Sequence, residues 1–392
     1  MTPAARLQAA IEIMDAVIDA ARAGGAAADT LVARYFASRR YAGSKDRRAV
    51  RELVYAAIRR AGEVPESGRA ALIGLASDRP ELLALFDGSV HGPAPLQGGE
   101  PAASAGLAPA WLVARLAETL DPADLPALLA RAPLDIRANR LKTTRELLLA
   151  ETGGTPGELA PDAIRLPEGT AVESLPAWRE GLFEVQDEGS QLVAEACGVR
   201  PGMTVIDLCA GAGGKALALA ATMQGRGRLI ACDVDRARLG RLPQRAGRAG
   251  VAGMIEQRLL DAGREPESLA DLAGMGDVVL VDAPCSGSGT WRRNPEARWR
   301  LTPERLARLT RLQDHVLGLA VPLVRPGGRL VYAVCSLMAE EGPERATTFL
   351  AHHPGWSAEP LPFGRASGPG RRLTPFCDGT DGFFVASLMA PC

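Results

Sequence analysis

The sequence predicts an α/β protein whose C-terminal half forms a mostly parallel, doubly wound sheet. From residue 201 onward, short runs rich in β-branched residues alternate with helix-like segments, which is typical of repeated βα units. Two of these runs, 277–285 (DVVLVDAPC) and 329–336 (RLVYAVCS), reach a cysteine where the chain turns. Because the carboxyl ends of parallel strands face the ligand crevice, we expect both thiols at one site if the strands are neighbours.

The part of the chain before this sheet is predicted to be helical at first. Apolar residues recur every three or four positions over 6–60, as on the buried face of helices. Residues 64–109 are irregular, and 91–101 is rich in Pro and Gly, which indicates a linker or exposed loop. A helix is expected at 111–132, followed by a small α+β unit with strands at 134–141 and 163–166 around a helix at 145–151.

The elements of the C-terminal half follow from the same patterns. Strands are expected at 204–209, 228–233, 254–260, 277–282 and 329–335, with a closing pair at 356–361 and 383–389. Helices are expected at 215–223, 236–249, 303–324 and 341–352. The closing strands lack a crossover helix between them, so we expect them to pair antiparallel. These elements predict domains at 1–75, 76–132, 133–180 and 181–392.

Composition narrows the class of protein. At 392 residues the chain exceeds one ordinary core, and no apolar run approaches the ~18 residues of a membrane span. Acidic residues within the first apolar stretch argue against a signal peptide. Seven cysteines without a CxxC pair favour a reducing cytoplasm, and none of the four histidines has ligand spacing, so we expect no metal site.

Positive charge is concentrated although the net charge is −1. Residues 33–60 hold nine Arg or Lys, 236–248 five Arg, and 292–311 seven Arg. A single stretch of this kind equally fits a solvated helix face, but three of them favour an RNA or DNA partner. The residues expected to contact RNA are Arg47, Arg48, Arg292, Arg293 and Arg298.

Residues 205–216 (VIDLCAGAGGKA) predict a strand, a glycine-rich turn and a helix. Glycines allow close backbone approach to a ligand, and the helix N-terminus offers free N–H groups. Asp233 ends the next strand, where a carboxylate can accept both hydroxyls of a ribose. The pattern indicates a nucleoside cofactor. NAD remains an alternative, since Gly211 and Gly213 also fit the dinucleotide fingerprint, and a ligand-free turn is the other interpretation.

Residues 282–300 (DAPCSGSGTWRRNPEARWR) combine an acid and a cysteine with Arg and Trp. Basic and aromatic side chains together suit phosphates and unstacked bases. Asp282 is expected in a dry pocket, where a carboxyl group can share a proton with a ring nitrogen. A helix cap or an ion pair is the structural alternative for this residue.

With these motifs the chain resembles the RsmB/Sun-type RNA cytosine-5 methyltransferases of the NOL/NOP/Sun superfamily. The resemblance rests on 207–215 (DLCAGAGGK), 282–286 (DAPCS) and 332–336 (YAVCS), supported by 184–190 (EVQDEGS), 289–300 and 381–384 (DGFF). It extends over nearly the whole chain: 1–62 looks like a NusB-like helical domain, and 134–178 like a small RNA-recognition unit. The family loop usually has Pro and Thr where this chain has Ala212 and Ala216, but the glycines and Lys215 are retained.

The resemblance implies a fold, a cofactor and roles for individual residues. The fold would be a class I S-adenosylmethionine-dependent methyltransferase with an N-terminal all-α NusB-like domain. Cys335 would attack cytosine C6, Cys285 would assist product release, and Asp282 and Lys215 would lie near the base. The cofactor would contact these residues: Cys209, Ala210, Gly211, Ala212, Gly213, Gly214, Lys215, Asp233, Asp261 and Asp282.

The resemblance also implies a substrate, 16S rRNA, because the NusB-like N-terminal region resembles that of the enzymes acting on small-subunit ribosomal RNA. Transfer RNA and 23S rRNA remain alternatives, and a non-catalytic RNA-binding or ribosome-assembly protein is the alternative from a different class. We expect a monomer, since the additional domains supply the RNA surface.

Overall fold

A computed structural model describes residues 1–392, which divide into two compact units. The helical unit comprises Met1–Arg131 and Thr290–Pro303, and the sheet unit comprises Ala132–Gly289 and Glu304–Cys392. The sequence predicted one uninterrupted domain over 181–392. The structure instead assigns the Arg- and Trp-rich segment Thr290–Pro303 to the helical unit, because its side chains are buried among the N-terminal helices.

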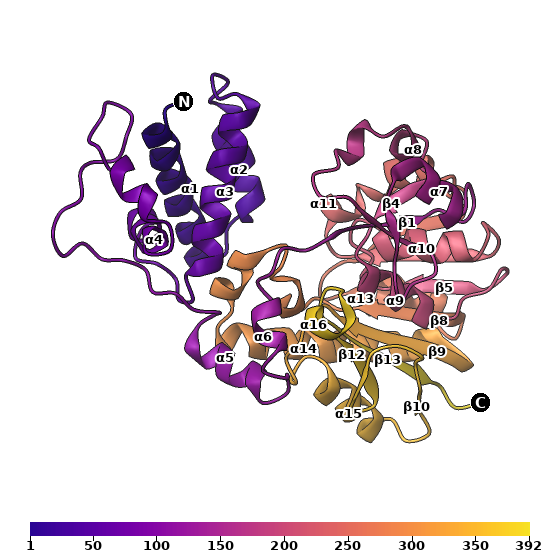
Figure 1. Cartoon of the computed structure of the whole chain (residues 1–392). Helices are drawn as coiled ribbons and strands as arrows, with labels where there is room; N and C mark the ends of the chain where they lie inside the picture. Colours follow the sequence, from indigo (N-terminus) through magenta and orange to yellow (C-terminus); the bar gives the residue numbers. More distant parts are fainter. The chain divides into compact units, whose positions relative to one another are not determined.

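The helical unit is built on four helices, drawn in indigo and violet in Figure 1. They are α1 (Pro3–Ala23), α2 (Ala28–Ala37), α3 (Ser44–Arg60) and α4 (Gly68–Ala76). The Thr2 side chain caps α1 by accepting from the amide of Ala5 at 3.1 Å, and Gly24 ends the helix with a φ of 73°. Apolar residues at helical spacing, such as Leu7, Met14 and Val54, form one buried core.

Shorter helices complete this unit. They are η1 (Pro80–Leu85), α5 (Ala110–Ala117) and α6 (Asp124–Ala127). The sequence predicted one helix over 111–132, but Pro122 lies in a break between residues 117 and 124, and the chain forms two short helices instead. Helix α4 lies in the stretch that the sequence analysis described as irregular.

A small antiparallel sheet of four strands opens the sheet unit, in the order β2-β3-β1-β4. Its strands are β1 (Leu134–Ala138), β2 (Thr155–Pro156), β3 (Ala163–Leu166) and β4 (Phe183–Val185), with α7 (Arg145–Thr152), η2 (Val172–Ser174) and α8 (Pro176–Arg179) between them. Strand β4 lies beyond the predicted boundary at residue 180, because it pairs with β1.

The large sheet has nine strands, with the main order β11-β12-β13-β9-β8-β5-β6-β7 and β10 paired to β13. The parallel strands are β5 (Thr204–Asp207), β6 (Arg228–Asp233), β7 (Ile255–Leu259), β8 (Gly276–Asp282) and β9 (Val324–Val334). The antiparallel strands are β10 (Ser357–Glu359), β11 (Arg365–Ser367), β12 (Gly370–Leu373) and β13 (Phe383–Met389). The predicted antiparallel pairing of the closing strands is confirmed, whereas the hairpin β11–β12 was not predicted.

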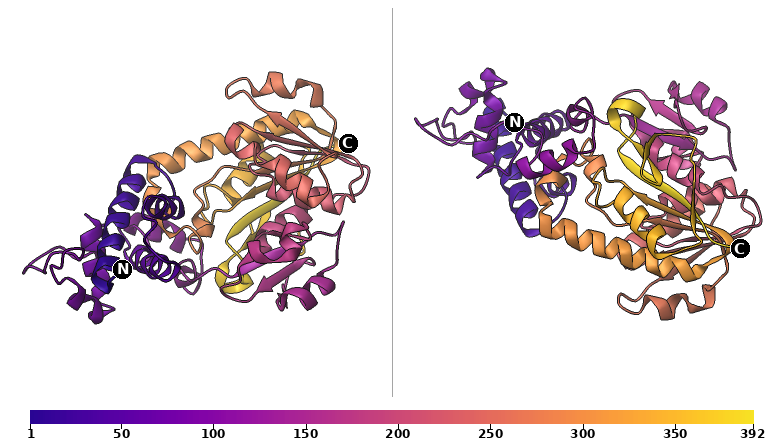
Figure 2. Two further views of the ribbon diagram at one scale, coloured as in Figure 1. Left: turned by 90° about the horizontal axis from the view of Figure 1, so that it is seen from above. Right: turned by 90° about the horizontal axis from the view of Figure 1, so that it is seen from below.

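Helices cover both faces of the large sheet, and each face has its own apolar core. One face packs against α9 (Glu188–Ala196), α10 (Gly214–Thr222), α11 (Arg236–Leu239) and α12 (Leu242–Ala249). The other packs against α13 (Glu265–Leu269), η3 (Ala270–Leu272), α14 (Pro303–Ala320), η6 (Val321–Leu323) and α15 (Pro343–His352). Figure 2 shows α14 as the long orange helix on one side of the strands. The doubly wound sheet predicted from the sequence is therefore confirmed.

The remaining elements lie in connecting segments. They are η4 (Ser288–Thr290), η5 (Pro295–Arg300) and α16 (Pro375–Asp378). Helix η5 lies in the segment that belongs to the helical unit.

Candidate active site

Two thiols meet at the carboxyl ends of the neighbouring strands β8 and β9. The strands pair in parallel with Asp282 opposite Ala333, and each chain reaches its cysteine a few residues later. The Sγ atoms of Cys285 and Cys335 lie 3.4 Å apart, and both side chains are half-buried. The structure therefore brings together the two thiols as strand order predicted.

The contact between the thiols changes the protonation of Cys285. The contact with Cys335, followed by burial, raises the pKa of the Cys285 thiol well above its usual value of 9.0. Cys285 therefore keeps its proton near neutral pH and can donate it to the Cys335 sulfur. Only a thiolate is a strong nucleophile, so a protonated Cys285 is not the attacking group.

A partly buried ion pair lies in the same part of the site. Lys215, from the first turn of α10, places its Nζ atom 2.7 Å from Oδ2 of Asp282 at the end of β8. Burial opposes the Lys215 charge, but Asp282 and the nearby Cys335 outweigh it and raise the pKa of Lys215 above 10.5. Lys215 also lies over the ring of Phe383, with Nζ 5.6 Å from its centroid. A fixed cation is thereby held next to the Cys335 sulfur.

A second carboxyl group, Asp207, ends β5 next to this pair and was not predicted as a site residue. It is fully buried, and neither side-chain oxygen has a hydrogen-bond partner in the structure. Burial, and then the charge of Asp282, raise the pKa of Asp207 from 3.8 to about 7. A buried carboxyl group without partners is costly when ionised, so Asp207 stays mostly protonated below pH 7.

The glycine-rich turn after β5 is held against the end of β6. The amide of Gly211 donates to Oδ2 of Asp233 at 2.7 Å, and the amide of Asp235 donates to Oδ1 at 2.7 Å. Each carboxylate oxygen can accept a further bond, so Asp233 retains the capacity to bind ribose hydroxyls. A side chain at Gly214 would meet no atom within 4 Å, which leaves the N-terminus of α10 open to a ligand. These features fit a nucleoside cofactor.

The other predicted cofactor residues lie around the same turn. The carbonyl of Ala212 accepts from Nη1 of Arg245 at 2.7 Å, so this loop is anchored without the proline usual in the family. Burial, and then Asp207, raise the pKa of Cys209 well above 9.0, which keeps that thiol protonated. Ala216 is buried in α10, whereas Asp261 follows β7 with an exposed side chain.

The segment after Cys285 is fixed by a close backbone contact with the loop before β13. The amide of Gly382 donates to the carbonyl of Gly289 at 2.8 Å, and a Cβ atom on Gly289 would lie 2.0 Å from the Gly382 carbonyl oxygen. No side chain fits there. The adjacent amide of Asp381 donates to Asp187 Oδ2 at 3.1 Å, which joins two motifs that the sequence analysis noted separately.

Sequence reasoning missed the polar groups beneath the thiols. Ser286 and Ser336 directly follow the two cysteines, and both hydroxyls donate to the buried carboxylate of Glu341. Gln313 from α14 donates to the same carboxylate at 3.0 Å. The repeated Cys-Ser pair was the available signal, whereas the sequence around Glu341 indicated only the start of a helix.

The expected RNA contact at Arg298 is corrected by the structure. Arg298 is fully buried in the helical unit, and its Nη2 donates to the carbonyls of Ile58 at 2.6 Å and Ala61 at 2.7 Å. Burial lowers the pKa of Arg298 to about 9. The guanidinium thus neutralises the C-terminal carbonyls of α3 instead of facing solvent. Arg292 is also buried, and Arg293 is half-buried.

Part of the positive charge of the basic stretch 236–248 is likewise neutralised by ion pairs. Arg245 and Arg248 from α12 bind the two oxygens of the buried Glu184 at 2.9 and 2.5 Å. Arg248 also stacks on Trp178 at 3.7 Å from the ring centroid. These arginines fix α12 to the small sheet, so local charge density alone overstated the free basic surface.

Of the predicted RNA contacts, Arg47 and Arg48 at the start of α3 are exposed. Arg47 also donates from Nε to the carbonyl of Ala42 at 2.9 Å, which orients its side chain. Both face solvent, where phosphate groups can reach them.

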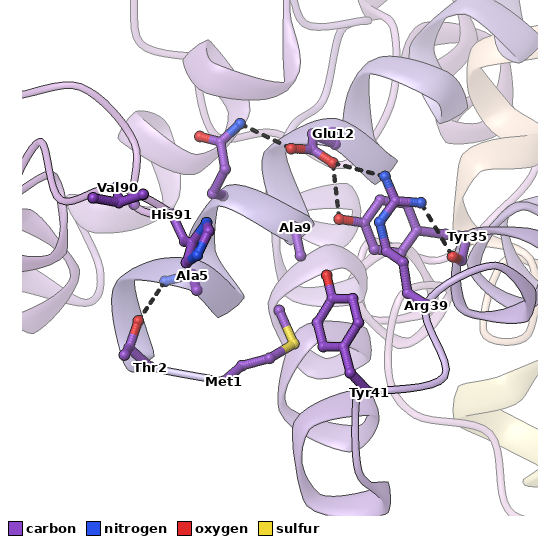
Figure 3. A pocket seen from close by; sticks show the side chains of 12 residues that line it. Met1, Thr2, Ala5, Ala9, Glu12, Tyr35, Arg39, Tyr41, Val90 and His91 are labelled. Carbon is purple, nitrogen blue, oxygen red and sulfur yellow. Dashed lines mark hydrogen bonds and ion pairs between the residues drawn. The ribbon is translucent and has the colours of Figure 1, made fainter.

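The helical unit also carries an open pocket of about 1080 Å³, shown in Figure 3. Glu12 lies at its side and accepts from the Tyr35 hydroxyl at 2.8 Å and from Gln8 at 3.2 Å. Arg39 lies over the Tyr35 ring, 3.7 Å from its centroid. Its polar groups largely satisfy one another, and neither Arg47 nor Arg48 lines it.

Two further features are absent from the structure. None of its helices combines the length and hydrophobicity needed to cross a bilayer. We find no cluster of three or more His, Cys, Asp or Glu side chains placed to hold a metal ion.

Taken together, the doubly wound sheet, the glycine turn after β5 and the acid ending β6 define an S-adenosylmethionine-dependent methyltransferase fold. Residues 196–389 match the family of 16S rRNA methyltransferases RsmB/F. The methyltransferase region of this chain is similar to that family.

Similar proteins agree with this assignment. The chain is 36% identical over 299 residues to a probable ribosomal RNA small subunit methyltransferase B of Synechocystis, a match covering 71% of this chain and 66% of the relative. It is 35% identical over 293 residues to the ribosomal RNA small subunit methyltransferase B of Pectobacterium carotovorum, covering 72% and 66%. The chain thus spans slightly less than two thirds of these curated relatives.

Solved structures show the same fold. A methyltransferase homologue from Pyrococcus horikoshii is 26% identical and superposes with a TM-score of 0.62 over 71% of this chain and 94% of its own. The crystal structure of PH0851, 24% identical, superposes with a TM-score of 0.76 over 97% of this chain and 98% of its own.

Proposed function

We propose that this protein methylates C5 of a cytosine in 16S rRNA, with S-adenosylmethionine as methyl donor and Cys335 as covalent nucleophile. The observation that carries the proposal is the pair of thiols 3.4 Å apart at the ends of β8 and β9. A fold that only binds RNA has no need of two cysteines together with a partly buried Lys215–Asp282 pair. The names of the relatives supply the substrate class.

The chemistry explains why a thiol is required. Cytosine C5 is a weak nucleophile while the ring remains conjugated. In the proposed reaction the Cys335 thiolate adds to C6, and the electrons of the C5–C6 double bond move to C5. C5 then takes the methyl group as its bond to the sulfonium sulfur of the donor breaks, which leaves S-adenosylhomocysteine. The C5 proton passes to water, the electrons of that C–H bond restore the double bond, and the C6–S bond breaks with its electrons returning to sulfur.

The neighbouring groups have defined tasks in this proposal. Asp282 contacts N3 and the amino edge of the base, and Lys215 fixes that carboxylate at 2.7 Å. Cys285 remains protonated and assists release of the product by donating to the sulfur that leaves. Product release therefore depends on a residue that does not attack the base.

The cofactor would be held along the turn after β5. Asp233 would accept the ribose hydroxyls, and Asp261 would lie on the adenine side. The backbone of Cys209, Ala210, Gly211, Ala212, Gly213 and Gly214 would surround the methionine part. S-adenosylmethionine supplies the methyl group when bound.

The RNA surface would be provided in part by the helical unit. Arg47 and Arg48 are proposed to contact phosphates, since they are exposed at the start of a basic helix. Arg292 and Arg293 lie next to the thiol-bearing loop in sequence. They are less accessible than Arg47 and Arg48, so we assign the main phosphate contacts to the pair on α3.

Bisulfite sequencing of total RNA tests the reaction and its substrate together. Cells lacking the gene should lose protection of one cytosine in 16S rRNA, and the intact gene should restore it while a Cys335→Ala copy should not. Loss of a tRNA or 23S rRNA site instead would keep the chemistry and change the substrate. Unchanged protection in all RNA would refute the proposed activity.

A further inference from the structure

Glu341 forms a buried polar centre beneath the two thiols. Its carboxylate is fully buried, just before α15. Oε1 accepts from the amide of Ser286 at 2.8 Å and from Nε2 of Gln313 at 3.0 Å. Oε2 accepts from the hydroxyl of Ser336 at 2.5 Å and also from the hydroxyl of Ser286. The carboxylate thus collects four donors at a single point.

These donors belong to the two segments that carry the cysteines. Ser286 follows Cys285 directly, and Ser336 follows Cys335 directly. Gln313 strengthens the link, since its Nε2 also donates to the carbonyl of Pro284 at 2.9 Å. One side chain therefore binds the residue after each cysteine, although the segments are fifty positions apart in sequence.

Further contacts fix Glu341 itself. Its main-chain carbonyl accepts from the hydroxyl of Tyr332 in β9 at 2.5 Å, and Tyr332 is fully buried. Ser288 adds another bond between the segments, with its Oγ 3.0 Å from Oγ of Ser336. Hydrogen bonds to an ionised group are short and strong, and a buried carboxylate without them is costly. The four donors directed to Glu341 therefore hold the two segments together.

We propose that Glu341 is a positioning residue that holds the Cys285 and Cys335 thiols at the separation needed for attack and release. The inference rests on the proposed two-thiol reaction. Glu341 acts on the thiols through Ser286 and Ser336, which directly follow the two cysteines. Reacting groups must be held within about 0.5 Å of productive geometry, which a single shared acceptor can enforce.

The decisive variant is Glu341→Gln, which keeps the size of the side chain but replaces one acceptor oxygen with a donor. The matched control is Glu344→Gln, three residues later and exposed at the start of α15. Ser336→Ala removes one donor with little change in volume and serves as a second variant if Glu341→Gln does not fold. Thermal unfolding and S-adenosylmethionine binding are measured for each purified protein.

The main readout is thiol geometry, which does not depend on methyl transfer. Diamide removes two electrons and two protons from a pair of thiols and leaves a disulfide, and peptide mass mapping follows the Cys285–Cys335 bridge. In the wild type the 3.4 Å separation should allow rapid closure. With Glu341→Gln or Ser336→Ala we expect closure slower by about tenfold and kcat lower by up to about a hundredfold, with the KM for both substrates unchanged.

The outcomes are separable. Slower closure with intact cofactor binding and normal behaviour of Glu344→Gln supports the positioning role, even if the RNA chemistry proves different. Closure and kcat equal to the wild type in both Glu341→Gln and Ser336→Ala overturns it, as does a loss confined to thermal stability.

Discussion

The ammonium group of Lys215 lies 2.7 Å from the carboxylate of Asp282, and the two side chains join the cofactor turn to the strand that leads to Cys285. Their side chains are 12% and 28% exposed, so the pair is only partly screened by water. Removing one partner of such a pair leaves a charge without compensation. This relationship makes the pair both a structural and a chemical element of the site.

Lys215→Met should therefore reduce stability and methyl transfer together. We expect a loss of about 1–3 kcal/mol in the free energy of unfolding, less than for a fully buried pair because Asp282 is partly solvated. The double variant Lys215→Met/Asp282→Asn should regain most of that stability in urea titrations without regaining activity. Equal stability of all three proteins would contradict a coupled pair, and restored activity would remove Asp282 from the reaction.

The raised pKa of Asp207 predicts that the stability of the protein depends on pH. Its folded-state pKa of about 7 exceeds the unfolded value of about 3.9, so the unfolded chain releases this proton first as pH rises. Its stabilising contribution is fully present below about pH 4 and is lost as pH rises through 7. Asp207→Asn remains neutral, so its gain in stability over the wild type should rise from about 1.5 kcal/mol at pH 5 to about 4 kcal/mol at pH 8.

Urea unfolding of wild type and Asp207→Asn at pH 5, 6, 7 and 8 (chosen to bracket the shifted pKa) measures this difference. Cofactor-free protein is used, so that binding does not contribute. Parallel stability curves for the two proteins would show that Asp207 is ionised in the folded state across the range.

Substitutions of Arg298 and Arg48 should affect different properties, folding for Arg298 and RNA binding for Arg48. Arg298→Met leaves the carbonyls at the end of α3 without their donor, and we expect a loss of about 3 kcal/mol in stability. Arg48→Ala, at an exposed position, should leave stability unchanged but weaken RNA binding and lower the salt slope of log K by about 1.

Chemical unfolding and RNA titrations at several salt concentrations distinguish these effects. If the Arg298→Met protein unfolds like the wild type but binds RNA more weakly, Arg298 contacts RNA as the sequence predicted. An Arg48→Ala protein with an unchanged salt slope would show that the phosphate contacts lie elsewhere.

The sequence predicted those parts of the site that depend on strand order. Strand β13, Phe383–Met389, lies where predicted, and the neighbouring strands β8 and β9 place Cys285 beside Cys335 because parallel strands end at a common edge. Local periodicity and motif spacing are sufficient for such features, since both are written in consecutive residues.

The features that escaped prediction depend on contacts between distant residues. Arg298 has the composition of an RNA contact, yet its partners are carbonyls about 240 positions earlier. Arg245 and Arg248 add to a basic stretch, but Glu184, more than sixty positions away, neutralises them. No local pattern reveals such pairing, and for the same reason Glu341 could not be recognised as the common acceptor beneath the thiols.

The most direct test of the account is the fate of the RNA in Cys285→Ala and Cys335→Ala proteins. After incubation with S-adenosylmethionine and 16S rRNA fragments, Cys285→Ala should accumulate a covalent RNA–protein complex that survives denaturing electrophoresis. Cys335→Ala and the double variant should form neither this complex nor product, while binding the cofactor normally. Methylation by Cys335→Ala, or a stable complex in the double variant, would contradict the assignment of Cys335 as nucleophile.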